Sequence, residues 1–193
     1  MIPGSIFKTV TLAAGLSAGV VNCDQMIDAP NSIIFNEGSV ANASYSTTGA
    51  LSVKDAFADS VNTVFAQIVL RMSFDDLYET ARAFGFDARI AQDFLCAESV
   101  IEGIDSMTPF YQAWTGVGQA QYGDDGIRRG PLVTPVHMAS LFAYFANGGI
   151  LYSPYVVSSF ENNDGSTCEM GSAAIAQNAS SLRYIRSDEA CCA

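Results

Sequence analysis

A serine and a lysine stand three positions apart near the start of the chain, in the segment Ser5-Ile6-Phe7-Lys8. In a helix, positions i and i+3 are surface neighbours, so the Ser5 hydroxyl and the Lys8 amine can approach hydrogen-bonding distance. A serine becomes a nucleophile when a base takes its proton, and a lysine is a base only when burial lowers its pKa. The pattern therefore favours a Ser5 nucleophile with Lys8 as its base. The competing interpretation is a helix-capping serine beside a solvated lysine.

A second polar pair, Ser60-Val61-Asn62, stands at the start of an apolar helical segment. Alone it is a weak signal, because roughly 0.9 such pairs are expected by chance, and two polar residues on an exposed helical turn are then the favoured explanation. Its position gives it weight, since the first helix of the same chain already offers the Ser5 and Lys8 pair. We expect the four side chains to converge on one site.

The spacing of apolar residues predicts the elements that must position these side chains. Helices are expected over residues 5–18, 52–71, 73–84, 109–117 and 135–147. Thr108 and Thr134 suit N-caps, because each precedes a proline in the first helical position. Ser73 to Asp76 resembles a capping box.

The remaining segments read mostly as loops and short strands. Residues 22–49 are polar, with one small strand near Ile33. Ile150 to Phe160 is expected to be a strand, and Asp164-Gly165 suggests a hairpin after it. Ser187 to Glu189 opens a helix that the sequence barely begins, so we expect the parent protein to continue beyond it.

Composition bounds the class of protein. The chain has 193 residues, 49% of them hydrophobic and 15% charged, which suits one packed domain or a large piece of one. A net charge of −11 disfavours nucleic acid as a partner. The single histidine and the absence of a C-x-x-C pair disfavour a structural metal, and no cofactor is expected. The apolar run after Lys8 also resembles a secretory signal, but a helix explains the same residues better.

Six motifs follow one another along nearly the whole chain, and their order is more specific than any one of them. They are Pro-Gly-Ser-Ile-Phe-Lys (3–8), Ser-Val-Asn-Thr-Val-Phe-Ala (60–66), Phe-Gly-Phe (84–86), Gly-Val-Gly-Gln (116–119), Thr-Pro-Val-His-Met-Ala (134–139) and Ala-Asn-Gly-Gly (146–149). In this order the sequence resembles the transpeptidase domains of penicillin-binding proteins, and most closely the class B, monofunctional ones.

The resemblance implies an α+β fold, namely the helix-dominated part of the β-lactamase/transpeptidase-like fold with an incomplete antiparallel sheet. It also implies a D,D-transpeptidase that forms an acyl-enzyme with peptidoglycan stem peptides ending in D-Ala-D-Ala, and that β-lactams acylate. Ser5 matches the family's nucleophile, and Lys8 matches its general base. Ser60 would relay the proton to the leaving group, and Asn62 would hold the substrate's amide and the lysine.

The sequence departs from the family pattern in its third motif, K-T-G. No lysine follows Lys54, and Thr47-Thr48-Gly49 precedes Ser60, in the wrong order. Residues 1–193 are therefore expected to be a partial transpeptidase domain that lacks the K-T-G strand. We expect this piece alone to be acylated slowly or not at all. The parent would work at the extracytoplasmic face of a bacterial membrane, held by an anchor absent from this chain.

Other residues invite different interpretations. His137 could belong to a Ser-His-Asp triad, but its place at a helix start favours packing. Arg128-Arg129 could attract an acidic peptide, although a solvated loop pair is favoured. Trp114 is expected in the helix core or in the wall of a groove.

Two other functions stay open. A serine β-lactamase would need a carboxylate to activate water, and Glu98 or Glu102 could supply one. A truncated or β-lactam-sensing protein would keep the fold without turnover.

Overall fold

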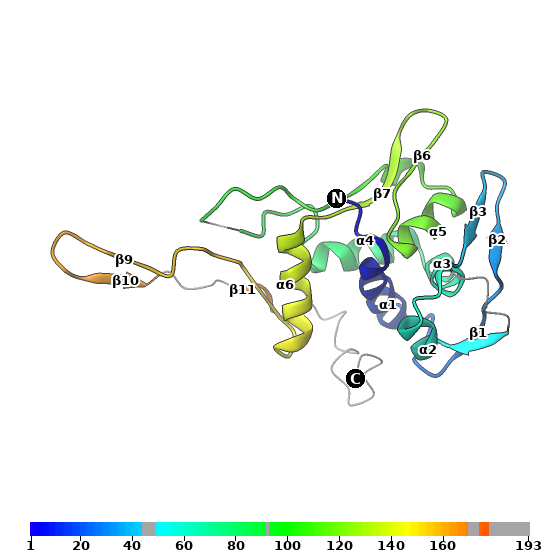
Figure 1. Ribbon diagram of the computed structural model, residues 1–193, viewed down its shortest axis with the longest axis horizontal. Coiled ribbons are helices and arrows are strands. Elements are labelled where there is room, and N and C mark those ends of the chain that lie inside the picture. Colours follow the sequence, from blue (N-terminus) through cyan, green and yellow to red (C-terminus); the bar gives the residue numbers. More distant parts are fainter. Residues whose placement is uncertain (44–48, 92, 170–173, 178–193) are drawn as a thin grey trace.

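The computed structural model describes residues 1–43, 49–91, 93–169 and 174–177 (Figure 1). The helices are η1 (Gly4–Phe7), α1 (Lys8–Ser17), α2 (Val53–Ala58), α3 (Asn62–Arg71), α4 (Phe74–Ala83), η2 (Ile104–Ser106), α5 (Pro109–Val117) and α6 (Pro135–Ala146). The strands are β1 (Met26–Asp28), β2 (Ser32–Ile34), β3 (Ser39–Ala41), β4 (Ala50–Ser52), β5 (Val100–Glu102), β6 (Gln121–Tyr122), β7 (Arg128–Leu132), β8 (Ile150–Tyr152), β9 (Ser159–Glu161), β10 (Thr167–Glu169) and β11 (Ala174–Gln177). The expected mixture of helices with short strands is confirmed.

Helix α1 forms the centre of the core. All of its residues from Lys8 to Leu16 are buried, and α3, α4 and α5 pack around it. Small residues allow these helices to approach closely. A Cβ on Gly15 would lie 2.8 Å from Ile68 of α3, and one on Gly116 of α5 would lie 2.7 Å from Val69. Because the interior is close-packed, larger residues at these two positions would push the helices apart.

The described strands pair in small antiparallel sheets. The three-stranded sheet has the order β5-β7-β6, and the pairs are β1-β4, β2-β3, β8-β11 and β9-β10. The β2-β3 hairpin lies beside the α3–α5 side of the core, whereas the β9-β10 hairpin projects away from the body (Figure 1). The β2-β3 hairpin and the β5-β7-β6 sheet thus pack against the helices, through contacts of β3 with α3 and α5 and of β7 with α5.

Most of the helices expected from sequence are present. Helix α5 has the bounds that its spacing predicts, and Ser73 and Asp76 form the expected capping box on α4. The Thr134 hydroxyl accepts a hydrogen bond from the His137 amide and caps α6. The helix expected over 5–18 begins instead with a 3₁₀ turn.

Two expectations from the sequence need correction, and a third concerns residues outside the described ranges. The continuous helix over 52–71 is wrong, because α2 and α3 are separated at residues 59–61. The strand over 150–160 is limited to β8 and the start of β9, although the hairpin at Gly165 is confirmed, with φ of +82° at that glycine. The helix expected from Ser187 lies outside the described residues.

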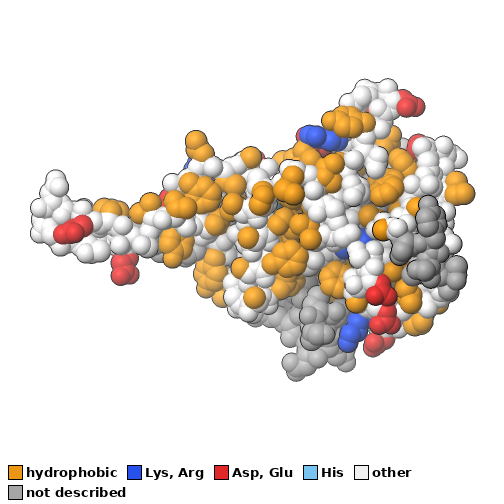
Figure 2. Space-filling model, in the orientation of Figure 1, with side chains coloured by type: hydrophobic (Ala, Val, Ile, Leu, Met, Phe, Trp, Pro, Cys, Tyr) orange, Lys and Arg blue, Asp and Glu red, His pale blue; other side chains and the backbone are white. Residues whose placement is uncertain are grey.

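The face of the molecule in Figure 2 is largely hydrophobic over α6 and the segment that follows it. Exposed apolar side chains there include Phe142, Tyr152 and Tyr155. Within the described ranges, no helix has both the length and the apolar character needed to cross a membrane.

Candidate active site

Lys8 begins α1 and is buried, with an exposed fraction of 1%. Its neighbour Phe7 is fully buried against Phe86, so the turn that carries Ser5 is fixed to the core on one side. Ser5 itself is exposed. The 3₁₀ turn therefore presents a hydroxyl to solvent while the following lysine enters the protein.

The Lys8 ammonium lies among four oxygen acceptors. Its Nζ donates to Ser5 Oγ at 3.3 Å, to Ser60 Oγ at 2.9 Å, to the Ser60 carbonyl at 2.6 Å and to Asn62 Oδ1 at 2.7 Å. The Phe65 ring lies beneath it, with the centroid 5.5 Å from Nζ. The structure thus brings together all four side chains singled out in the sequence. Ser5 and Lys8 come from η1 and the start of α1, and Ser60 and Asn62 come from the break before α3 and its first residue.

The acceptors around Lys8 are neutral. In the described part of the chain, no carboxylate lies within ion-pair distance of its Nζ. Burial lowers the pKa of Lys8 from 10.5 to about 8, because the charged form loses water. At pH 7 about a tenth of the molecules then hold a neutral amine that can accept a proton.

Ser60 lies in the break between α2 and α3, in a left-handed conformation with φ of +56°. This conformation costs a non-glycine residue about 1 kcal/mol or more. It turns the Ser60 carbonyl toward Lys8, where the hydrogen bond offsets the cost. A continuous helix over 52–71 would instead direct that carbonyl along the helix axis, so the break serves the lysine site.

Asn62 is the first residue of α3, and its amide is held at both ends. The Nδ2 group donates to the Ala41 carbonyl at 2.8 Å, and Oδ1 accepts from Lys8. Because Nδ2 is engaged by strand β3, the oxygen must face the lysine. Sequence reasoning did not identify the role of Ala41, since a backbone contact between remote segments leaves no signal in side-chain types.

A second backbone contact fixes the Ser5 turn from the side of α5. The Gly4 amide donates to the Gly118 carbonyl at 2.8 Å. Gly118 ends α5 with φ of +88°, and a Cβ there would lie 2.0 Å from the Gly4 carbonyl oxygen. A side chain at this position is therefore excluded unless the turn before Ser5 moves. The Gly-Val-Gly-Gln motif thus helps to fix the position of Ser5.

His137 is packed, as expected, and does not contact Ser5 or Lys8. Its Nε2 lies 2.7 Å from the Phe84 carbonyl, and its ring lies against Phe86 at a centroid distance of 4.9 Å. Burial lowers the pKa of His137. This residue therefore holds α6 against the segment after α4.

The two adjacent arginines were expected in a solvated loop, and this is wrong. Both belong to strand β7, and each is ion-paired, Arg128 with Glu102 and Arg129 with Asp125. The Arg129 side chain is 5% exposed. The pairing also engages Glu102, one of the two carboxylates considered for a water-activating role. Glu98 makes no ion pair among the described residues.

Trp114 is partly buried against the core, on the same helix as Phe110 and Tyr111. In the described segments, no group of three or more His, Cys, Asp or Glu side chains could hold a metal ion.

Around Lys8, a serine hydroxyl and an amine lie 3.3 Å apart, an arrangement that suits proton transfer from the hydroxyl to the neutral amine.

Comparison with known proteins identifies the family. Residues 1–186 match the family model described as the penicillin binding protein transpeptidase domain. The peptidoglycan D,D-transpeptidase PbpA of Mycobacterium tuberculosis (strain CDC 1551 / Oshkosh) is 34% identical over 169 residues, which cover 84% of this chain and 32% of the relative. This chain thus spans about a third of the length of that relative.

Solved structures share the fold. The D,D-transpeptidase domain of a peptidoglycan glycosyltransferase from Eggerthella lenta has a TM-score of 0.86 at 27% identity, over 96% of this chain and 46% of that chain. Penicillin-binding protein A from M. tuberculosis, as an imipenem acyl-enzyme complex, has a TM-score of 0.79 at 28% identity, over 96% of this chain and 42% of that chain.

Proposed function

Because the chain belongs to the family of penicillin-binding protein transpeptidase domains, we propose that it carries the acylation site of a D,D-transpeptidase that cross-links peptidoglycan. The substrates are stem peptides ending in D-Ala-D-Ala, and β-lactams acylate the same serine. The site acts at the extracytoplasmic face of the cell membrane, where peptidoglycan is assembled. The observation that carries the proposal is a buried lysine with a lowered pKa in contact with Ser5, Ser60 and Asn62.

The first step is acylation of Ser5. Neutral Lys8 accepts the Ser5 hydroxyl proton, and Oγ attacks the carbonyl carbon of the penultimate D-alanine. The C–N bond to the last D-alanine breaks, and its nitrogen takes a proton that passes from Lys8 through Ser60 Oγ. The products are a Ser5 ester and free D-alanine. The 2.9 Å contact between Lys8 Nζ and Ser60 Oγ supports this relay.

The second step transfers the acyl group. An amine of another stem peptide attacks the carbonyl carbon of the Ser5 ester, and neutral Lys8 accepts a proton from that amine. The bond from the acyl carbon to Ser5 Oγ then breaks, and Oγ takes the proton from Lys8. A β-lactam follows the first step only, because its cleaved amide nitrogen remains tethered to the acyl group. The ester then persists and the enzyme is inhibited.

The test is covalent labelling of the full-length protein with a fluorescent penicillin, read on a denaturing gel. We expect label on the wild type and on Ser158→Ala, an exposed serine far along the chain, but none on Ser5→Ala. Equal labelling of Ser5→Ala would contradict the assignment of the nucleophile. Label that is lost within minutes would favour a β-lactamase over a transpeptidase.

A further inference from the structure

The end of strand β3 makes three side-chain contacts with the first two residues of α3. Besides the bond from Asn62 Nδ2 to the Ala41 carbonyl, Asn42 Oδ1 accepts from the Thr63 amide at 3.0 Å, and Asn42 Nδ2 lies 3.2 Å from Thr63 Oγ1. Thr63 is fully buried. Asn42 therefore holds the residue that follows Asn62 by both its backbone and its side chain.

Helix α3 needs such a contact because its own N-cap cannot provide one. The N-cap residue is Val61, and no side-chain hydrogen bond is formed by it. The amide groups in the first turn of a helix lack intrahelical partners, and a buried one left unpaired is costly. Asn42 supplies the missing acceptor from another part of the chain.

Asn42 is itself anchored to the segment before β2. Its side-chain Nδ2 donates to the Pro30 carbonyl at 3.0 Å, and its backbone N–H donates to the Asn31 carbonyl at 3.1 Å. An asparagine fits this place because one side chain must both accept from Thr63 and donate to Pro30. The β2-β3 hairpin is thus tied to the helix start that carries Asn62.

We propose that Asn42 is a positioning residue for acylation, which acts by holding the first turn of α3 so that Asn62 Oδ1 faces Lys8. The inference depends on the proposed function. Asn42 contacts helix α3 through Thr63, so its effect on Lys8 passes through the first turn of α3 and Asn62. Loss of the Asn42 side chain removes its two contacts with Thr63 and leaves, among the described contacts from the end of β3, only that of Ala41 to hold the first turn of α3, so the 2.7 Å bond between Asn62 and Lys8 is held less firmly.

A double-mutant cycle tests this route. The rate constant for acylation by a fluorescent penicillin is measured for the full-length wild type, Asn42→Ala, Asn62→Ala and the double variant, with the melting temperature of each. We expect Asn42→Ala to lower the rate constant about 10- to 100-fold, the size of effect that a small misplacement produces. In the Asn62→Ala background, Asn42→Ala should cause no further loss, because the side chain it positions is gone.

Two further variants serve as a matched control and as a substitute for the alanine variant. Asn36→Ala changes an exposed asparagine in the turn of the same hairpin and should be acylated like the wild type. Asn42→Asp keeps an acceptor for the Thr63 amide but loses the donors. It replaces Asn42→Ala in the cycle if the alanine variant does not fold.

The outcomes separate the two proposals. An unlabelled wild type would overturn the proposed function, and this inference with it. A labelled wild type whose Asn42 variants keep the wild-type rate, or whose losses multiply in the double variant, would overturn the role of Asn42 alone. If the role of Asn42 is purely structural, its variants have a lower melting temperature, and the loss of rate that they cause is the same with and without Asn62.

Discussion

Among the residues that the structure describes, Lys8 and Arg129 are the buried members of the lysine and arginine side chains, and their surroundings differ. Lys8 is 1% exposed and Arg129 4%. Lys8 is surrounded by neutral oxygens, and burial lowers its pKa to about 8. Arg129 faces the Asp125 carboxylate, whose hydrogen bond raises the pKa of the guanidinium. A guanidinium stays protonated in either setting, and the carboxylate offsets the cost of burying its charge, whereas a buried lysine among neutral acceptors can release its proton.

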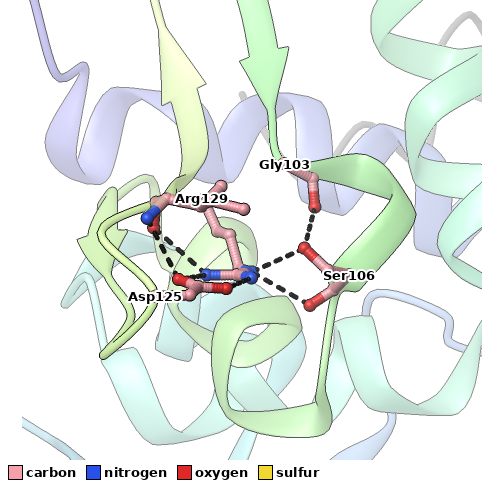
Figure 3. Close-up of polar contacts among 5 residues, drawn as sticks. Gly103, Ser106, Asp125 and Arg129 are labelled. Atoms are coloured by element: carbon pink, nitrogen blue, oxygen red, sulfur yellow. Dashed lines mark hydrogen bonds and ion pairs between the residues drawn. The ribbon is translucent and has the colours of Figure 1, made fainter.

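Arg129 is held on several sides, as Figure 3 shows. Its Nη1 donates to Asp125 Oδ1 at 3.0 Å, and its Nε donates to the Ser106 hydroxyl and carbonyl at 2.8 and 3.0 Å. Ser106 Oγ in turn donates to the Gly103 carbonyl at 3.4 Å. The Tyr111 ring covers the guanidinium at 4.7 Å. These contacts join the β6-β7 hairpin to the η2 turn and to α5, which is a structural task.

The largest expected effect comes from removing the proton acceptor. Lys8→Met should lower the rate constant for penicillin acylation about 10²- to 10⁴-fold, the usual contribution of a positioned base. Lys54→Met, at an exposed lysine of α2, is the matched control and should leave the rate unchanged. Stopped-flow or gel-based labelling measures both, with circular dichroism to verify folding. A fast Lys8→Met variant would mean that another group is the base.

The second effect is a pH dependence of stability caused by Lys8. Its pKa is about 8 in the folded protein and 10.5 in the unfolded chain, so between these values the unfolded chain binds more protons. The free energy of unfolding should therefore rise with pH, by roughly 2 to 3 kcal/mol from pH 7 to pH 10. Urea titrations of the wild type and Lys8→Met isolate this effect by their difference. A difference that does not change with pH would show that Lys8 titrates normally.

The third effect concerns the structural cation. Arg129→Met should lower the melting temperature by about 5 °C, because it removes several hydrogen bonds and leaves Ser106 and Asp125 without their donor. Acylation of the folded protein should be unchanged, since Arg129 contacts none of the four site residues. Arg129→Lys should recover little, because an ammonium cannot reproduce the guanidinium fork. A loss of acylation at an unchanged melting temperature would mean that the two cations are coupled.

The sequence predicted what local patterns encode. Thr-Pro pairs marked the starts of α5 and α6, and the spacing of Ser5 and Lys8 placed them on adjoining turns. The break before α3 was not predicted because apolar residues continue across it at helical spacing. Ser60 adopts a left-handed backbone conformation there, and a serine gives no indication of this in the sequence. The strand expected near Ile33 is β2, one residue from its predicted bounds.

Contacts between remote segments were not predictable in this way. Asn42 lies in a polar stretch that reads as loop, and its partners Pro30 and Thr63 are brought to it by folding. Arg129 was assigned to solvent although Asp125 stands four residues before it, a spacing that could have indicated a pair. The tight approach of Gly4 and Gly118 likewise depends on how α1 and α5 pack.

The smallest expected effect lies at acid pH, on the partner of the structural cation. The hydrogen bond from Arg129 lowers the pKa of Asp125 from 3.8 to about 2. A carboxyl group whose folded pKa is depressed stabilises the protein above its unfolded pKa, and this stabilisation is lost as pH falls from about 4 to 2. Because Asp125 is 47% exposed, water screens the pair and the loss should be modest. Melting temperatures of the wild type and Asp125→Asn should therefore converge as pH falls through this range, with the wild type higher at pH 7. A constant gap would show that Asp125 gains nothing from Arg129, and the carboxylate would then not account for the contrast with Lys8.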